Sequence, residues 1–256
     1  MTTATATTYV KYELLRTIRN KRSFFFSLAF PLIMYYLLAL PNKDNHNFGG
    51  TKSSPTHLFA PQYYMIGLLA FGSMIAIMSG GARIAQERSV GWNRQLRITP
   101  LSARTYFRAK VLTGYLMVAV SIVLLYASGL ALGVRLHPVS HWFTMTGLVL
   151  IALVPFAALG IALGHMLTID SMGPAMGGIT SIFAFLGGTW FPITGGGFFA
   201  GLCKTLPSYW LVKAGQIGYG LSSDPWGARG WLTVGAWAVA CTAFAIWAYR
   251  RDTGRV

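Results

Sequence analysis

The sequence predicts an all-α integral membrane protein with six transmembrane helices, and composition and apolar pattern both lead to this prediction. Of 256 residues, 54% are hydrophobic and only 11% are charged, whereas a soluble domain carries roughly 25% charged residues. A helix needs about 20 apolar residues to cross a bilayer core of about 30 Å, and it satisfies its own backbone in lipid. The predicted spans, all free of Asp, Glu, Lys and Arg, are residues 23–40, 62–81, 111–134, 141–166, 174–191 and 230–249.

The basic residues predict how the chain is oriented. There are 21 Lys and Arg against 6 Asp and Glu, a net charge of +15. They fall between apolar runs, so the positive-inside rule and anionic headgroups explain them, and we expect membrane lipids but no nucleic acid as partners. Most of them precede the first span, follow the second span or follow the last span. Both termini are therefore expected in the cytoplasm, for a multi-pass protein of the bacterial inner membrane.

Two segments outside the spans also have a predicted structure. In residues 5–22, Val10, Leu14 and Ile18 form an apolar stripe with Glu13 and Arg16 opposite, which is the pattern of an amphipathic helix in the headgroup plane. The alternative is a basic flank that only stops transfer. Residues 192–229 are too polar and too broken by Pro and Gly to span. There we expect a short helical segment that re-enters or caps the outer leaflet. Together with the spans these segments form one transmembrane domain, residues 1–256.

Motifs for an enzyme or a motor are absent from the sequence. A phosphate loop needs Gly-Lys, and that dipeptide does not occur. His-Glu-x-x-His and Gly-x-Ser-x-Gly are missing as well. The two cysteines, Cys203 and Cys241, have no metal-binding spacing. We therefore expect no catalytic, cofactor-binding or metal site, and any energy for transport must come from a partner.

The cytoplasmic loop, residues 83–110, carries a family resemblance. It reads Gln-Glu-Arg-Ser-Val-Gly-Trp from Gln86 and Leu-Arg-Ile-Thr-Pro-Leu-Ser from Leu96, and its basic stretch ends at Lys110. This resembles the Glu-Arg-x-x-Gly-Thr and Leu-x-x-Thr-Pro-Leu-Ser elements of ABC-2 type permeases, with Trp92 where the family usually has Thr. The run Gly-Thr-Trp-Phe-Pro from Gly188 is similar to another family element. The drug- and antibiotic-export branch is the most similar.

The resemblance implies a function for the whole chain. It would be the permease subunit of an ATP-driven exporter, moving a lipophilic or amphiphilic substrate (a drug, an antibiotic or a lipid-like molecule) by alternating access. Its partners would be two ABC ATPase subunits, which hold ATP and Mg²⁺, and a second permease half, identical or homologous. The alternatives are export of a polysaccharide, a lipid-linked glycan or an ion by the same type of complex, a self-contained channel or carrier, and, more remotely, an intramembrane enzyme acting on lipids.

The resemblance also implies two groups of functional residues. The loop would form a coupling helix in a groove of the ATPase, with apolar side chains as the anchor and charged ones around it. The coupling residues would be Glu87, Arg88, Trp92, Arg94, Leu96, Ile98, Pro100 and Leu101. In the family, spans two and five line the substrate path. The path residues would be Met65, Phe71, Met74, Met78, Phe183, Phe185 and Trp190; such residues also serve in plain packing or lipid contact.

Overall fold

The structure is a computed structural model that describes residues 3–19, 21–48, 59–92, 102–136, 138–191, 193, 197–215 and 226–253. All regular elements in this described part of the chain are helices. In chain order they are α1 (Thr3–Arg19), α2 (Lys21–Ala39), η1 (Leu40–Asn42), α3 (Ala60–Ser89), α5 (Ala103–Ala131), α6 (Ser140–Ala152), α7 (Val154–Met166), α8 (Ile169–Gly187), α9 (Phe198–Cys203), α10 (Pro207–Gly215) and α11 (Gly227–Thr253).

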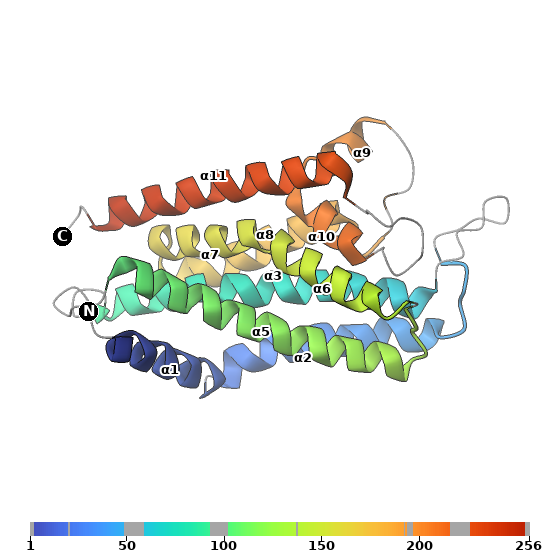
Figure 1. Ribbon diagram of the computed structural model, residues 1–256, viewed down its shortest axis with the longest axis horizontal. Coiled ribbons are helices and arrows are strands. Elements are labelled where there is room, and N and C mark those ends of the chain that lie inside the picture. The colour runs from blue at the N-terminus through green and yellow to red at the C-terminus, as the bar shows by residue number, and fades with distance from the viewer. Residues whose placement is uncertain are drawn as a thin grey trace.

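The long helices lie side by side in an elongated bundle (Figure 1). Both chain termini lie at one end of it, here called the termini end, and α9 and α10 lie at the opposite, far end. Among the described residues, five helical segments are long and apolar enough to cross a membrane: Ala60–Ser89, Thr105–Ala131, Ser140–Met166, Ile169–Gly187 and Gly227–Asp252. The shorter apolar stretch Ser27–Asn42 covers much of the first predicted span. The predicted all-α membrane protein is confirmed, and the count of six spans stays a prediction.

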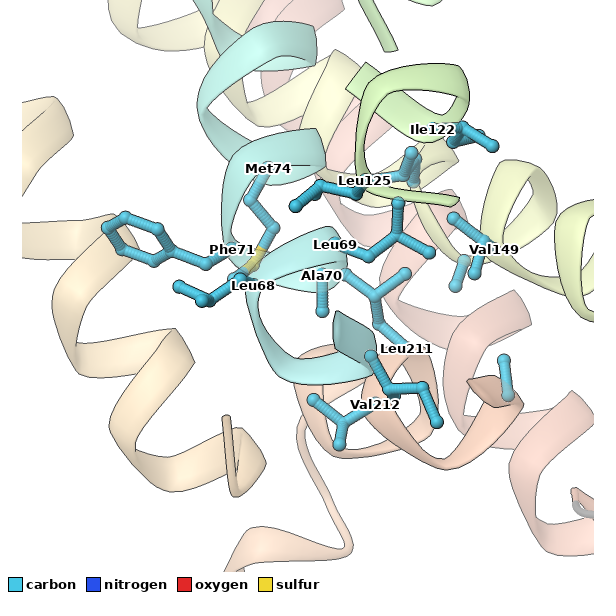
Figure 2. Close-up of a cluster of buried hydrophobic side chains, with 14 of the residues drawn as sticks. Leu68, Leu69, Ala70, Phe71, Met74, Ile122, Leu125, Val149, Leu211 and Val212 are labelled. Atoms are coloured by element: carbon cyan, nitrogen blue, oxygen red, sulfur yellow. The ribbon is translucent and has the colours of Figure 1, made fainter. Parts of the chain in front are cut away.

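Helix α3 occupies the centre of the bundle and packs against α2, α5, α7, α8 and α10. Apolar side chains cover all of its faces, and such a helix is stable only when it is enclosed. Figure 2 shows Leu69 of α3 close to Leu125 of α5 and Val149 of α6, and Leu68 on another side of α3 beside Phe71. These five helices therefore surround α3, whereas α11 packs against α7.

Glycines allow two of these neighbours to approach α3 closely. A Cβ atom on Gly160 of α7 would lie 2.8 Å from the Cα of Met78, and one on Gly81 of α3 would collide with the Gly160 carbonyl. On the other side of α3, a Cβ on Gly72 would lie 2.9 Å from the ring of Pro31 in α2. Small residues at such crossings are how membrane helices gain packing contacts without a hydrophobic drive.

The fourth predicted span, residues 141–166, consists of two helices. α6 ends and α7 begins around Leu153, and Pro155 stands in the first turn of α7. Proline has no amide hydrogen to donate, and its ring crowds the carbonyl four residues back, so it interrupts the helix. The hydroxyl of Tyr115 in α5 donates to the carbonyl of Leu150 at 3.0 Å, just before the break.

Tryptophan side chains join the short helices of the far end to α11. The indole N–H of Trp237 in α11 donates to the carbonyl of Thr205 at 2.7 Å, and that of Trp226 donates to the carbonyl of Trp210 at 2.9 Å. Helices α9 and α10 lie in the segment where short helices were predicted. Whether they re-enter the membrane stays a prediction.

Candidate functional site

A cluster of charged side chains lies at the termini end, where α1, α3 and α5 meet. We call it the ionic junction, and it consists of Glu13 and Arg16 of α1, Arg83 and Glu87 of α3, and Tyr106 and Lys110 of α5. Its members are three or four residues apart on each helix, and that spacing places side chains on one helical face. Each helix therefore turns a charged or polar face toward the other two.

Lys110 is the central residue of the ionic junction. Its Nζ lies 2.6 Å from a carboxylate oxygen of Glu13 and 2.6 Å from one of Glu87, and its side chain is 0% exposed. The carboxylate of Glu87 also accepts hydrogen bonds from the hydroxyl of Tyr106 and from the guanidinium of Arg16, both at 2.9 Å. These bonds tie the end of α3 to the start of α5 and to α1.

Arg83 supplies the second buried cation. Its guanidinium donates to the hydroxyls of Thr17 at 2.8 Å and Thr113 at 3.1 Å, and its Nε lies 3.6 Å from the Glu13 carboxylate. Two buried carboxylates thus face two buried cations, and the half-exposed Arg16 lies at the rim. A buried charge is tolerated when it is paired and hydrogen-bonded in this way. Burial, with the nearby Glu13 and Glu87, raises the pKa of the Tyr9 hydroxyl above its usual value.

A second group of polar contacts joins the ends of α3, α7 and α11. Arg88 donates to Asp252 at 3.0 Å and to the carbonyls of Gly164 and Leu167, both at 3.1 Å. These carbonyls belong to the last turn of α7, where unpaired oxygens attract a cation. The other oxygen of Asp252 lies 2.9 Å from Nδ1 of His165. The two groups of contacts leave Glu87 and Arg88, neighbours in sequence, bonded to different parts of the bundle.

The predicted coupling residues fall into three groups. Glu87 is fully buried in the ionic junction, and Arg88 is partly buried against Asp252. Trp92, two residues beyond the C-terminal cap of α3, is 42% exposed. The remaining predicted coupling residues lie outside the described residues: Arg94, Leu96, Ile98, Pro100 and Leu101. The described part of the loop therefore combines an enclosed charged base with an exposed aromatic side chain.

Whether α1 lies in the headgroup plane stays a prediction, but the side of α1 that carries Glu13 packs against the bundle. A helix in the headgroup plane would turn Glu13 toward headgroups and water, but Glu13 and Thr17 are buried against α3 and α5. Tyr12 and Leu15 are exposed instead. The reason is that Arg83 and Lys110, at the ends of two predicted spans, need anionic and polar partners, and α1 supplies them.

Some of the predicted path residues are buried and others are more exposed. Met65, Met74 and Met78 of α3 are buried inside the chain. Phe71 is also buried, with its ring 5.5 Å from that of Trp190, while Phe183 packs edge-on against Phe156 with ring centres 5.3 Å apart. Only Phe185 is strongly exposed, and it lines a shallow apolar recess on α8 with Ser181, Ile182, Leu186 and Trp190.

Helix α8 has an unusual surface for a membrane span. Of the five span candidates it has the lowest mean hydropathy, and it is also the least buried. Gly173, Gly177 and Ser181 repeat every four residues along it, and a Cβ on either glycine would meet nothing within 4 Å. A span that lies against lipid is expected to be more apolar than its neighbours, so this exposed face is better suited to contact with protein.

Sequence reasoning missed most of the ionic junction. Lys110 immediately precedes the predicted span 111–134, and Arg83 follows the span 62–81, so both were interpreted as orientation signals, and Lys110 also as the end of the basic stretch in the family motif. A usable signal was present, because a charged side chain within one turn of an apolar span needs an oppositely charged or polar partner. Among the described residues, no group of three or more His, Cys, Asp or Glu could hold a metal ion.

Comparison with known proteins identifies the family. The family model described as ABC-2 family transporter protein matches residues 44–247. The chain is also 30% identical over 183 residues to YvfS of Bacillus subtilis (strain 168), which carries the name of a transport permease, and the match covers 70% of this chain and 71% of YvfS. The chain therefore belongs to the ABC-2 transporter family: it is a multi-pass, non-catalytic membrane component of an ABC transport system, a kind of subunit that associates with ABC ATPases.

Proposed function

We propose that this chain is the permease half of an exporter that carries a lipophilic or amphiphilic substrate out of the cytoplasm by alternating access. Its place would be the bacterial inner membrane, with the termini end in the cytoplasm. Two ATPase subunits would bind ATP and Mg²⁺, and this chain would hold no cofactor. The observation that carries the proposal is the ionic junction, because it joins both stems of the 83–110 loop to the rest of the bundle.

The ionic junction gives the loop a stiff base. Glu87, near the end of α3, and Lys110, in α5, are joined by a buried bond of 2.6 Å, and Glu13 holds α1 to the same ammonium group. Breaking a buried pair of this kind costs about 3–5 kcal/mol. A push on the loop is therefore passed to α3 and α5 together instead of being absorbed at their ends.

The exposed part of the loop supplies the contact with the ATPase. Val90 and Trp92 are 70% and 42% exposed, and exposed apolar side chains next to charged ones are typical of interface anchors. We propose that Trp92, Leu96, Ile98, Pro100 and Leu101 fill the groove of the ATPase and that Arg94 fixes their orientation. Glu87 and Arg88 then act by holding the base of the loop, since their polar groups are bonded within this chain.

We propose that the exposed face of α8 meets the second permease half, which is identical or homologous. The Gly173, Gly177 and Ser181 repeat would let the two helices approach closely. The path would then form between the two halves, beside the apolar recess that holds Phe185 and Trp190. Apolar and aromatic side chains there favour an amphiphilic substrate. The buried methionines of α3 would stabilise the half itself.

The coupling part of the proposal is tested in the reconstituted complex with its ATPase. Replacing Leu96 and Leu101 together by Glu should weaken assembly and separate ATP hydrolysis from transport, because charged side chains cannot fill an apolar groove. Arg251→Glu is the control, since Arg251 is exposed at the same end of the bundle but lies on α11. Unchanged assembly and transport in the Leu96 and Leu101 variant would refute the coupling role.

The proposed contact between α8 and the second permease half is tested by cross-linking in the membrane. Ser181→Cys should form a cross-linked pair of chains in high yield, and Val123→Cys, exposed on α5, is the matched control. Gly177→Leu should abolish the Ser181→Cys product without unfolding the chain, because the space around Gly177 is open. Equal cross-linking at both cysteine positions would exclude α8 as the contact face between identical halves.

A further inference from the structure

An apolar groove of about 350 Å³ lies between α5, α7 and α11, away from the exposed face of α8. Val111 of α5 and Ile246 of α11 contribute its walls, and the small side chains of Ala158 and Ala245 lie at its floor. Ala158 and Ala245 are buried, whereas Ile246 is 49% exposed, so the groove opens on the outer surface of the bundle. Its lining contains none of the predicted coupling or path residues, although Phe107 lies within residues 83–110.

Water is an unfavourable occupant of this apolar groove. All three of its helices belong to segments that could span a membrane, and almost all of its lining is apolar. An engineered apolar cavity of about 150 Å³ stays dry and binds benzene or xenon, and this groove has roughly twice that volume. Its volume is also within the range of roughly 300–1,000 Å³ that ligand sites occupy. An apolar chain is the occupant that this lining favours.

The termini end of the groove is bordered by aromatic rings and then by cations. The rings of Phe107 and Tyr249 lie 4.9 Å apart there, one from α5 and one from α11. Arg108 stands three residues before Val111 on α5, and Arg250 stands four residues after Ile246 on α11. This register continues the groove-lining stripe of each helix, and both arginines are exposed. The apolar groove thus ends at two positive charges from different helices.

We propose that the groove binds one acyl chain of an anionic phospholipid and that Arg108 and Arg250 hold its phosphate. A guanidinium matches phosphate oxygens with paired hydrogen bonds, and two of them favour an anionic headgroup over a zwitterionic one. The lateral opening lets the lipid enter from the bilayer without passing through the chain. The bound lipid fills the gap between α5 and α11 over α7. This site is independent of the proposed export function.

The test measures which lipid the purified full-length chain retains. The chain is placed in nanodiscs of equal parts dioleoyl phosphatidylglycerol and dioleoyl phosphatidylcholine, transferred to mild detergent and analysed by native mass spectrometry. One phosphatidylglycerol per chain is expected. Arg108→Gln and Arg250→Gln should each lower its retention relative to phosphatidylcholine by about five-fold. Arg251→Gln, with its guanidinium over the Trp247 ring, is the control and should change nothing.

A second pair of variants tests the groove itself. Ala245→Leu places a larger side chain at the floor and should expel the acyl chain, whereas Ala243→Leu, exposed on the same helix and outside the lining, should not. Thermal unfolding identifies a groove variant that fails to fold. In that case the Arg108 and Arg250 variants test the proposal. Equal retention of the two lipids by the unmodified chain would overturn the proposal. Displacement of the phosphatidylglycerol by a transported compound would also overturn it, by assigning the groove to the substrate path.

Discussion

Replacing Lys110 by methionine tests whether the ionic junction stabilises the bundle. Methionine keeps most of the length of the buried side chain but removes the ammonium group, and with it two bonds of 2.6 Å to Glu13 and Glu87. Both carboxylates remain buried and lose their shared cation. Hydrogen bonds to charged groups contribute about 1.5–3 kcal/mol each, and breaking a buried pair costs about 3–5 kcal/mol. The expected loss is therefore about 3–5 kcal/mol.

The matched control removes a different cation from the same carboxylate. Arg16 also bonds to Glu87, at 2.9 Å, but its side chain is 45% exposed, so Arg16→Gln should cost at most about 1 kcal/mol. For a chain of this size each kcal/mol lowers the unfolding midpoint by about 2–4 °C. Tryptophan fluorescence during heating in detergent should show a fall of about 6–20 °C for Lys110→Met and of at most about 4 °C for Arg16→Gln. Equal shifts would refute the central role of Lys110.

Three other substitutions test separate parts of the bundle. Gly160→Leu should reduce the yield of monodisperse protein, because its Cβ would lie 2.8 Å from the backbone of α3 and overpacking costs about 1–3 kcal/mol or more. Tyr115→Phe removes the donor to the Leu150 carbonyl and should lower the unfolding midpoint by about 2–6 °C. Asp252→Asn weakens the contacts that hold the end of α11 and should speed limited proteolysis there, whereas Asp170→Asn, exposed in the first turn of α8, should not.

Each of these expectations has a contradicting result. A normal yield of Gly160→Leu would mean that α3 and α7 are not in close contact. An unchanged midpoint for Tyr115→Phe would show that water or another donor already satisfies the Leu150 carbonyl. Equal proteolysis of the Asp252 and Asp170 variants would show that the contacts of Asp252 do not hold α11.

The apolar runs were the part of the fold that the sequence specified well. The span predicted at residues 62–81 lies inside α3, and the one at 230–249 lies inside α11. The helices extend beyond the predicted ends because a helix continues past the apolar core when its charged residues find partners, as Arg83 and Glu87 do. The length of an apolar run reflects the thickness of the bilayer core and does not give the full length of the helix.

The pairing of charges could not be read from the sequence. Glu13 and Lys110 are 97 residues apart, and nothing in their local patterns shows that they meet. The break between α6 and α7 was not predicted either, since residues 141–166 were predicted as one span, although Pro155 and its missing amide hydrogen are a physical reason for two helices. The coupling role predicted for residues 83–110 came from the family resemblance, and the structure adds only the burial of the loop's base and the exposure of Trp92.

The enclosure of α3 has a mechanical consequence. Its 30 residues form a rod of about 45 Å. Near one end Glu87 is held by Lys110, and near the other the hydroxyl of Tyr63 donates to the carbonyl of Gly188 at 2.6 Å, beyond the end of α8. No proline lies between these two anchor points, and the helix is unbroken there. A shift or twist applied at Glu87 is therefore expected to be passed, turn by turn, to Tyr63 near the other end of the helix.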